Sequence, residues 1–245
     1  MDMRLLAIGD IHGYLGSLEA LLSEVNPTPQ DRVVFLGDYV NKGPSVSSTV
    51  DFLIELSRHP DWIFLRGNHD QMMLDTYHDL DSLDAWECLS GGNPLASYGR
   101  GSTVDLLTRV PRSHWKFLEE RCLDFFETES HIFVHGGIRP SLEPCQEEVE
   151  RLQSMVLSDA MPHESGRLVV CGHSSQATGE IADLGHTVCI DTGIAKGQFL
   201  TCLDLEDFSY TQASEKGEIR KGQLRPIGSS ALVEGRKGIE SESIG

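Results

Sequence analysis

The feature that most constrains the fold is a set of short apolar runs, each ending in glycine and polar residues. Five such runs occur along the chain: MRLLAI before GDIHG, RVVFL before GDYVNKG, WIFL before RGNHD, HIFV before HGG, and RLVV before CGH. Runs of this length without strict alternation are typical of strands buried on both faces of a sheet. Amphipathic stretches separate the first three runs, which predicts alternating strands and helices and an α/β fold.

The remaining segments define the expected domain organisation. Residues 71–128 have a mostly helical pattern and are expected to form a helical insert on one side. Residues 186–206 are expected to add antiparallel strands of a second sheet, because no long helix separates their apolar runs. Residues 215–245 are polar and rich in glycine and serine, which predicts a flexible tail. We therefore expect a single domain over residues 1–214, followed by this tail.

The charge of the chain limits its partners. The 245 residues include 20 Lys and Arg against 38 Asp and Glu, a formal net charge of -18. The negative electrostatic field of such a chain repels the phosphate backbones of nucleic acids, so no nucleic-acid partner is expected. No stretch approaches the roughly 18 apolar residues of a membrane span, and we expect a soluble, cytoplasmic monomer with no membrane partner. The six cysteines contain no CxxC pair, so we expect free, buried thiols.

Metal-binding residue types stand at the ends of the predicted strands. Because ligands bind at the carboxyl ends of strands in an open α/β sheet, we expect these side chains to converge. Carboxylate, imidazole and amide groups without a thiolate favour manganese, iron or zinc. Six ligands suit two divalent ions about 3.5 to 4 Å apart that share one carboxylate. The candidate ligands are Asp10, His12, Asp38, Asn68, His135 and His173.

The motifs GDIHG, GDYVNKG, RGNHD, VHGG and CGH resemble, in this order, the motif series of the metallophosphoesterase superfamily. Within it they are most similar to the phosphoprotein phosphatases, a family of serine/threonine phosphatases and their bacterial relatives. The resemblance covers residues 4 to about 205. It implies a four-layer α/β/β/α sandwich, in which two mixed sheets are flanked by helices.

The resemblance also implies roles for the site residues. A water or hydroxide held between two ions, manganese before iron or zinc, would attack phosphorus without a covalent intermediate. His69 would protonate the leaving oxygen. Asp70, beside it, is instead expected to cap the following helix, because a carboxylate favours a helix N-terminus. The first metal would be bound by Asp10, His12 and Asp38, and the second by Asp38 as a bridge together with Asn68, His135 and His173.

Two positions depart from the resembled family. Where that family usually has Asp-Arg, this chain has Asn41 and Lys42. Asn41 is expected to be the partner of His69, from which it can accept a hydrogen bond without adding charge, and Lys42 is expected to bind phosphate as a point charge. Arg139, just after the HGG turn, is a second candidate phosphate ligand. Asn-Lys before Gly-Pro, and GNHD in place of GNHE, resemble the branch related to diadenosine tetraphosphatases.

Three functions compete. The main expectation is metal-dependent hydrolysis of phosphoserine and phosphothreonine monoesters, with a phosphorylated protein as substrate. The alternative is hydrolysis of a phosphoanhydride, such as a dinucleoside polyphosphate or polyphosphate, by the same metals. A non-catalytic phosphate-binding regulator is disfavoured, because all six candidate ligands are present.

Overall fold

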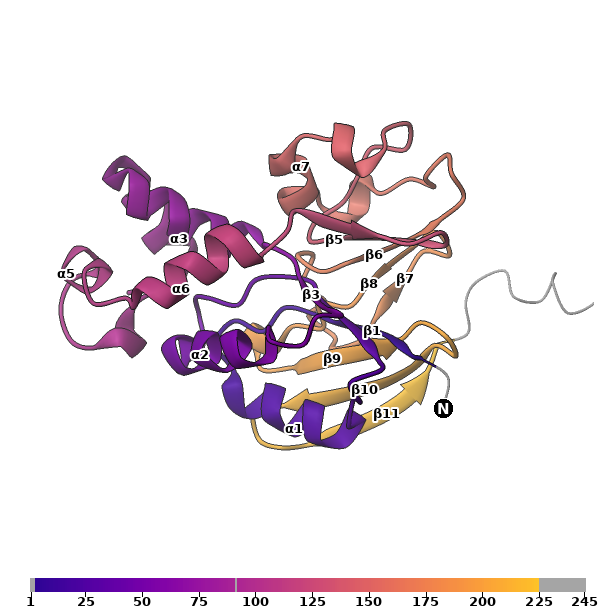
Figure 1. The fold of residues 1–245 in the computed structure, drawn as a ribbon, viewed down its shortest axis with the longest axis horizontal. Helices are drawn as coiled ribbons and strands as arrows, with labels where there is room; N and C mark the ends of the chain where they lie inside the picture. Colours follow the sequence, from indigo (N-terminus) through magenta and orange to yellow (C-terminus); the bar gives the residue numbers. More distant parts are fainter. Residues whose placement is uncertain (1–2, 91, 225–245) are drawn as a thin grey trace, which may run out of the picture.

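The structure is a computed structural model that describes residues 3–90 and 92–224. Two mixed sheets face each other, and helices cover their outer sides (Figure 1). The predicted α/β/β/α arrangement is therefore confirmed. Among the described residues, no helix is both long and apolar enough to cross a membrane.

The first sheet has six strands in the order β11-β10-β9-β1-β2-β3. Its strands β1, β2 and β3 are parallel, while β9 pairs antiparallel with β1 and leads through β10 to the edge strand β11. The strands are β1 (Leu5–Ile8), β2 (Arg32–Phe35), β3 (Trp62–Phe64), β9 (Phe199–Asp204), β10 (Ser209–Ser214) and β11 (Ile219–Gln223).

The second sheet has five strands in the order β4-β5-β6-β8-β7. Its central strands β5, β6 and β8 are parallel, and both edge strands pair antiparallel with their neighbours. The strands are β4 (Phe125–Glu127), β5 (His131–Val134), β6 (Leu168–Cys171), β7 (Ala182–Asp183) and β8 (Thr187–Cys189).

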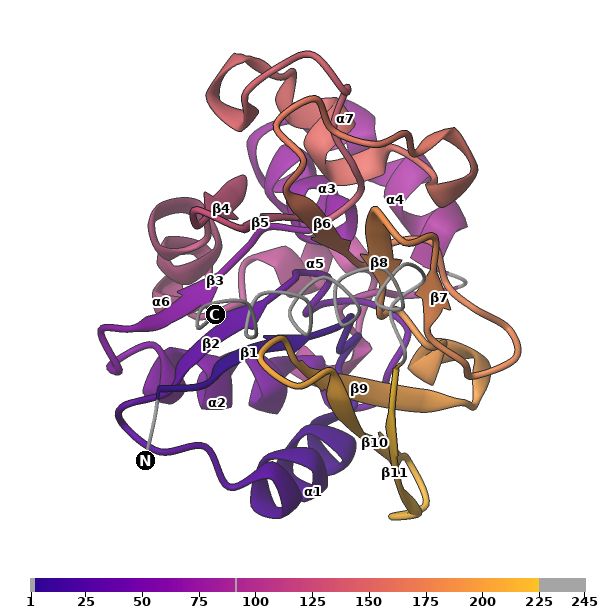
Figure 2. The same cartoon turned by 90° about the vertical axis from the view of Figure 1, so that its right-hand side faces the viewer.

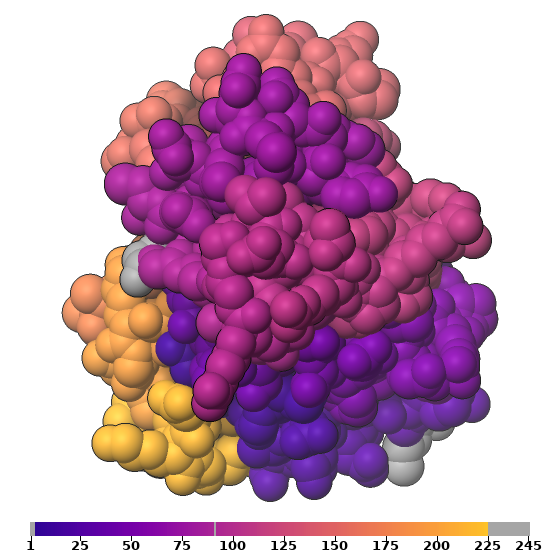
Figure 3. All heavy atoms as spheres, turned by 90° about the vertical axis from the view of Figure 1, so that its left-hand side faces the viewer, coloured from indigo at the N-terminus to yellow at the C-terminus, as the bar shows by residue number. Residues whose placement is uncertain are grey.

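Helices pack on the outer side of each sheet (Figure 2), and residues of a helical insert cover much of one face of the molecule (Figure 3). Helices α1 (Leu15–Val25) and α2 (Val46–Leu56) bury one apolar face each against the first sheet, and α7 (Val149–Ser154) covers the second. The insert contains α3 (Asn68–His78), η1 (Leu80–Ser82), α4 (Leu83–Ser90), η2 (Ala96–Tyr98), α5 (Thr103–Leu107), α6 (Arg112–Lys116) and η3 (Phe117–Arg121). Short turns η4 (Pro144–Gln146), η5 (Leu157–Asp159) and η6 (Ile194–Lys196) complete the set.

Alternate residues of the central strands face different cores. In β1, Leu6 and Ile8 pack under the helices of the first sheet, whereas Leu5 and Ala7 face the second sheet. Phe133 of β5 meets them from the opposite sheet. Burial on both faces explains why these strands are continuous apolar runs.

Two expectations about the later strands are corrected. β8 pairs parallel with β6, and β9 joins the first sheet instead of the second. The chain therefore returns from one sheet to the other within residues 190–198, a crossing that is set by tertiary packing and not by local pattern.

The expectation that a flexible tail begins at residue 215 is also corrected. Residues 219–223 form β11, which pairs antiparallel with β10 through a turn at Gly217. Backbone hydrogen bonds to β10 hold this polar strand. The Arg220 guanidinium also lies 3.9 Å from the Phe199 ring centroid. Because neither interaction needs apolar side chains, the sequence has no apolar pattern that predicts this strand. Residues 225–245 of the expected tail lie outside the described residues.

The cysteines are only partly as expected. All six thiols are free. Four are buried, but Cys88 and Cys145 are exposed.

We predict that Phe133→Ala lowers the free energy of unfolding by about 3 to 5 kcal/mol, because it opens a cavity between the two sheets. Phe133 is fully buried there. Urea unfolding would measure the change, with Leu184→Ala, at an exposed residue, as the control expected within about 0.5 kcal/mol of the parent. A loss at Phe133 no larger than in this control would contradict the two-sheet core.

Candidate active site

The ends of the predicted strands meet at one cavity of about 450 Å³. His12, Asp38, Asn68, His69 and His173 all line it. The other two strand-end residues are buried against this group: Asp10 accepts a hydrogen bond from the His173 backbone, and His135 approaches Asp38. All six candidate ligands are thus brought together, although they come from five separate places in the sequence.

Asp38 lies at the centre of the cluster. Its Oδ1 is 3.4 Å from Nε2 of His135, and its Oδ2 is 3.5 Å from Nε2 of His12. Oδ1 also accepts a hydrogen bond from the backbone N–H of His69 at 3.0 Å. A Cβ at Gly67 would come within 2.1 Å of this oxygen, so only glycine fits there. The two carboxylate oxygens of Asp38 thus face different imidazoles, those of His135 and His12.

Backbone contacts hold Asp38 in place. Its carbonyl oxygen accepts hydrogen bonds from the N–H groups of Ile11 and His12, at 3.1 and 2.7 Å. Asp70 caps α3 as expected by accepting from Gly67 N–H at 3.0 Å. Asp70 also accepts from Tyr39 N–H at 2.9 Å, so its carboxylate joins the loop after β2 to the start of α3.

Two imidazoles are oriented by backbone carbonyls. Nδ1 of His12 lies 3.0 Å from Val40 O, and Nδ1 of His135 lies 2.8 Å from Leu36 O. Each Nδ1 therefore donates, which turns Nε2 toward Asp38 and leaves its lone pair free in the neutral ring. Such carbonyl contacts are the usual way in which proteins orient metal-ligating histidines.

The remaining ligands gather around the amide of Asn68, the first residue of α3. Its Oδ1 lies 2.9 Å from Nδ1 of His173 and 3.2 Å from Nε2 of His135. The Asn68 amide oxygen and one ring nitrogen each of His173 and His135 thus form one group of potential ligand atoms.

Burial keeps two of the histidines neutral. It lowers the pKa of His12 to about 3 and, with the charge of His135 as a second cause, that of His173 to about 4. Both rings are therefore unprotonated near pH 7, as metal ligation requires.

His135 behaves in the opposite way. Burial lowers its pKa, but the carboxylates of Asp38 and Asp10 outweigh burial and raise the pKa to about 10. In turn, burial raises the pKa of Asp38, but the charge and hydrogen bond of His135, together with the charges of His69 and His12, outweigh burial and hold this pKa well below its usual range. The cluster thus attracts positive charge at its centre.

The donor set fits two divalent ions. Two groups, His12–Asp38–His69 and Asp10–Asp38–His135, each have side-chain nitrogen and oxygen atoms within 4.8 Å of one another. In the first group, Asn41 occupies Nδ1 of His69, so His12 and Asp38 are its candidate ligands. Asp38 belongs to both groups, which suits a bridging carboxylate. Bound ions would polarise phosphoryl oxygens and activate water.

His69 and Asn41 are in direct contact, as expected. Nδ2 of Asn41 lies 2.5 Å from Nδ1 of His69, and Oδ1 of Asn41 accepts a hydrogen bond from Nε1 of Trp86 at 3.0 Å. The amide therefore presents its nitrogen to His69, which corrects the expectation that Asn41 accepts a hydrogen bond from the histidine. Sequence reasoning also missed Trp86, since nothing in its local pattern distinguishes it from a core residue.

Of the two expected phosphate ligands, the structure brings only Lys42 to the cavity. The guanidinium of Arg139 instead pairs with Glu147, with Nη2 and Oε1 2.6 Å apart, and Arg139 does not line the cavity. The cavity also contains Asp191 and Lys196, which sequence reasoning missed. Asp191 follows the apolar run of β8 and precedes Thr-Gly, the same strand-end pattern as that of the candidate ligands.

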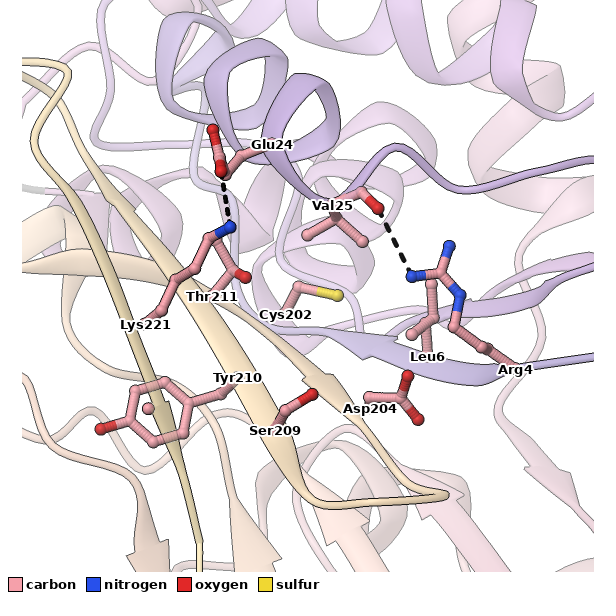
Figure 4. Close-up of a pocket in the computed structure, with 11 residues that line it drawn as sticks. Arg4, Leu6, Glu24, Val25, Cys202, Asp204, Ser209, Tyr210, Thr211 and Lys221 are labelled. Atoms are coloured by element: carbon pink, nitrogen blue, oxygen red, sulfur yellow. Dashed lines mark hydrogen bonds and ion pairs between the residues drawn. The ribbon is translucent and has the colours of Figure 1, made fainter.

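A second cavity, of about 230 Å³, lies between α1 and the strands β9 to β11 (Figure 4). Its cations already have partners: Lys221 pairs with Glu24 at 2.6 Å, and Arg4 pairs with Asp31 at 2.6 Å. None of the strand-end residues lines it. The cavity at the strand ends is therefore the candidate active site.

We predict that Asp38→Asn reduces the binding of both metal ions, whereas Asp10→Asn weakens one, because only Asp38 belongs to both ligand groups. Elemental analysis of purified variants, after manganese loading and gel filtration, would measure the stoichiometry. Asp61→Asn, at an exposed carboxylate, is the control and should retain both ions. Equal losses in the Asp38 and Asp10 variants would contradict a bridging role for Asp38.

Two symmetrical bis(5'-nucleosyl)-tetraphosphatases are among the relatives that match this chain. A symmetrical bis(5'-nucleosyl)-tetraphosphatase of Paracidovorax citrulli (strain AAC00-1) is 28% identical over 219 residues, covering 87% of this chain and 72% of the relative. A second, from Marinomonas sp. (strain MWYL1), is 27% identical over 162 residues, covering 65% of this chain and 54% of the relative. The chain thus spans about half the length of the second relative.

Structure comparison agrees on the fold. A crystal structure described as that of a candidate diadenosine tetraphosphatase superposes with a TM-score of 0.62 at 20% identity, over 92% of this chain and 95% of the other. Residues 3–189 match the calcineurin-like phosphoesterase family. Because this match spans most of the chain and includes all six candidate ligands, the protein belongs to the calcineurin-like phosphoesterase family.

Proposed function

We propose that this phosphoesterase hydrolyses phosphoanhydride bonds of dinucleoside polyphosphates with the help of two divalent ions, manganese first among them. The observation that carries the proposal is that the two relatives described above are both named symmetrical bis(5'-nucleosyl)-tetraphosphatases. This favours the alternative from the sequence over the main expectation of a serine/threonine phosphatase. The structural neighbour supports the fold alone, since its identity is 20%.

Two lysines support a polyanionic substrate. Lys42, from the loop after β2, and Lys196, at the end of η6 after β8, line the same cavity. They are exposed cations beside a buried acidic cluster, in a chain with a net charge of -18. Local positive charge at a cleft attracts anions more strongly as their charge increases, so a tetraphosphate gains more than a monoester.

The residues of the site have separate roles in the proposed reaction. The six candidate ligands, including the amide of Asn68, would hold the ions, and Lys42 and Lys196 would bind phosphate oxygens away from the reacting phosphorus. His69 faces the cavity and contacts the phosphate that leaves. A phosphate is a good leaving group, because it departs as a stabilised anion.

The proposal is tested by assaying the manganese-loaded protein against diadenosine tetraphosphate, inorganic polyphosphate and a phosphoserine peptide side by side. We expect kcat/KM for the tetraphosphate to exceed that for the peptide by about tenfold or more, equivalent to about 1.4 kcal/mol in the barrier. Chelator and Asp38→Asn should each abolish turnover, which excludes a contaminating enzyme. A preference for the phosphopeptide would restore the protein phosphatase hypothesis.

We also predict that Lys196→Gln lowers kcat/KM for diadenosine tetraphosphate by about tenfold and that for p-nitrophenyl phosphate by less than about twofold. The reason is that only the longer substrate extends far enough to use a second cation, and a charged hydrogen bond contributes about 1.5 to 3 kcal/mol. Lys116→Gln, which removes an exposed lysine outside the cavity, is the matched control. Equal losses on both substrates would mean that Lys196 acts on the reacting phosphate itself or on folding.

A further inference from the structure

The contact between Trp86 and Asn41 fixes the direction of a buried amide. Trp86 lies in α4 of the helical insert, and both side chains are fully buried. An indole N–H can only donate a hydrogen bond, so the group 3.0 Å from it must be the amide oxygen of Asn41. The amide nitrogen is thereby turned toward His69.

This direction determines where His69 carries its proton. The amide nitrogen of Asn41 donates, so Nδ1 of His69, 2.5 Å away, must accept. A neutral imidazole with its lone pair at Nδ1 has its proton on Nε2. Since Nδ1 is occupied by Asn41, Nε2–H is the group that His69 presents to the cavity that it lines.

The backbone supports the same arrangement. Asn41 has a φ of 71°, in the left-handed region that asparagine tolerates better than most residues. The residue is also fully buried, so its amide has no solvent-exposed alternative.

We propose that Trp86 is a positioning residue, which acts through Asn41 to keep His69 in the Nε2–H tautomer, so that His69 donates a hydrogen bond to the leaving group without transferring its proton. In the reaction, water oxygen bonds to phosphorus, and the bond to the leaving oxygen breaks with its electron pair. The water proton passes to solvent, and the leaving phosphate departs as an anion that accepts the hydrogen bond from Nε2–H. The proposal deepens the proposed function, on which its leaving-group part rests.

The arrangement favours anhydrides over alkyl esters. A serine alkoxide leaves well only when it receives a proton, and a neutral imidazole is a poor source of one. A carboxylate at position 41 would instead accept from Nδ1–H and stabilise the doubly protonated ring that delivers protons readily. The orientation that Trp86 gives to Asn41 therefore favours substrates whose leaving group departs without receiving a proton.

The first test is the 15N NMR spectrum of the His69 side chain in the metal-free protein, which reports the tautomer without any activity. The parent should show Nδ1 as an acceptor nitrogen and Nε2 as protonated. Trp86→Phe keeps the aromatic ring but removes the N–H, so the amide can turn and the two shifts should move toward each other. Trp115→Phe, at another buried tryptophan of the insert, is the matched control and should leave them unchanged.

The second test compares aryl phosphates of graded leaving-group pKa with the manganese-loaded protein. We expect kcat to fall steeply with increasing leaving-group basicity in the parent and less steeply in Asn41→Asp. Trp86→Phe should lower kcat for diadenosine tetraphosphate about threefold to tenfold, with little change in KM.

The two proposals fail separately. A protonated Nδ1 in the parent, or His69 shifts that are the same in Trp86→Phe, would overturn the role of Trp86. An Nε2–H tautomer that depends on Trp86, in a protein that does not hydrolyse the tetraphosphate, would uphold that role and overturn the proposed substrate.

Discussion

The active site depends on the Asp38 carboxylate, which stands between two imidazoles where the ends of both sheets meet. One oxygen faces His12, from the loop after β1, and the other faces His135, which follows β5 in the second sheet. Its backbone carbonyl binds the loop that carries His12. A buried carboxylate is costly unless positive charge or hydrogen bonds compensate it. The convergence of these groups explains why glycine at position 67 and the capping Asp70 are needed around it.

The helical insert has a direct connection to this chemistry. Its α4 contributes Cys88, Leu89 and Ser90 to the cavity wall, and Trp86 reaches the amide of Asn41. The insert thus both bounds the substrate cavity and sets the hydrogen bonds of a residue in it. We therefore expect substitutions in the insert to alter specificity without replacing a candidate metal ligand.

The sequence alone determined the fold class, the family and the six candidate ligands that converge. Each of these conclusions rests on local information: an apolar run predicts a buried strand, and Asp, His or Asn directly after it lies at the strand end. The parallel order of β1, β2 and β3 follows from the helices between them. Because the carboxyl ends of parallel strands share one edge, residues far apart in sequence could be expected to meet.

Only the tertiary structure decided the features that depend on contacts between distant segments. Arg139 has the right residue type and position for a phosphate ligand, yet Glu147 occupies its guanidinium. Asn41 could present either its amide oxygen or its amide nitrogen to His69. The hydrogen bond from Trp86, 45 residues further along the chain, determines which of them faces the histidine. The polar strand β11 is held by backbone pairing, which leaves no pattern of side chains. Apolar periodicity and residue type can be read from the sequence, but the direction of a hydrogen bond depends on which neighbour the fold brings to each donor and acceptor.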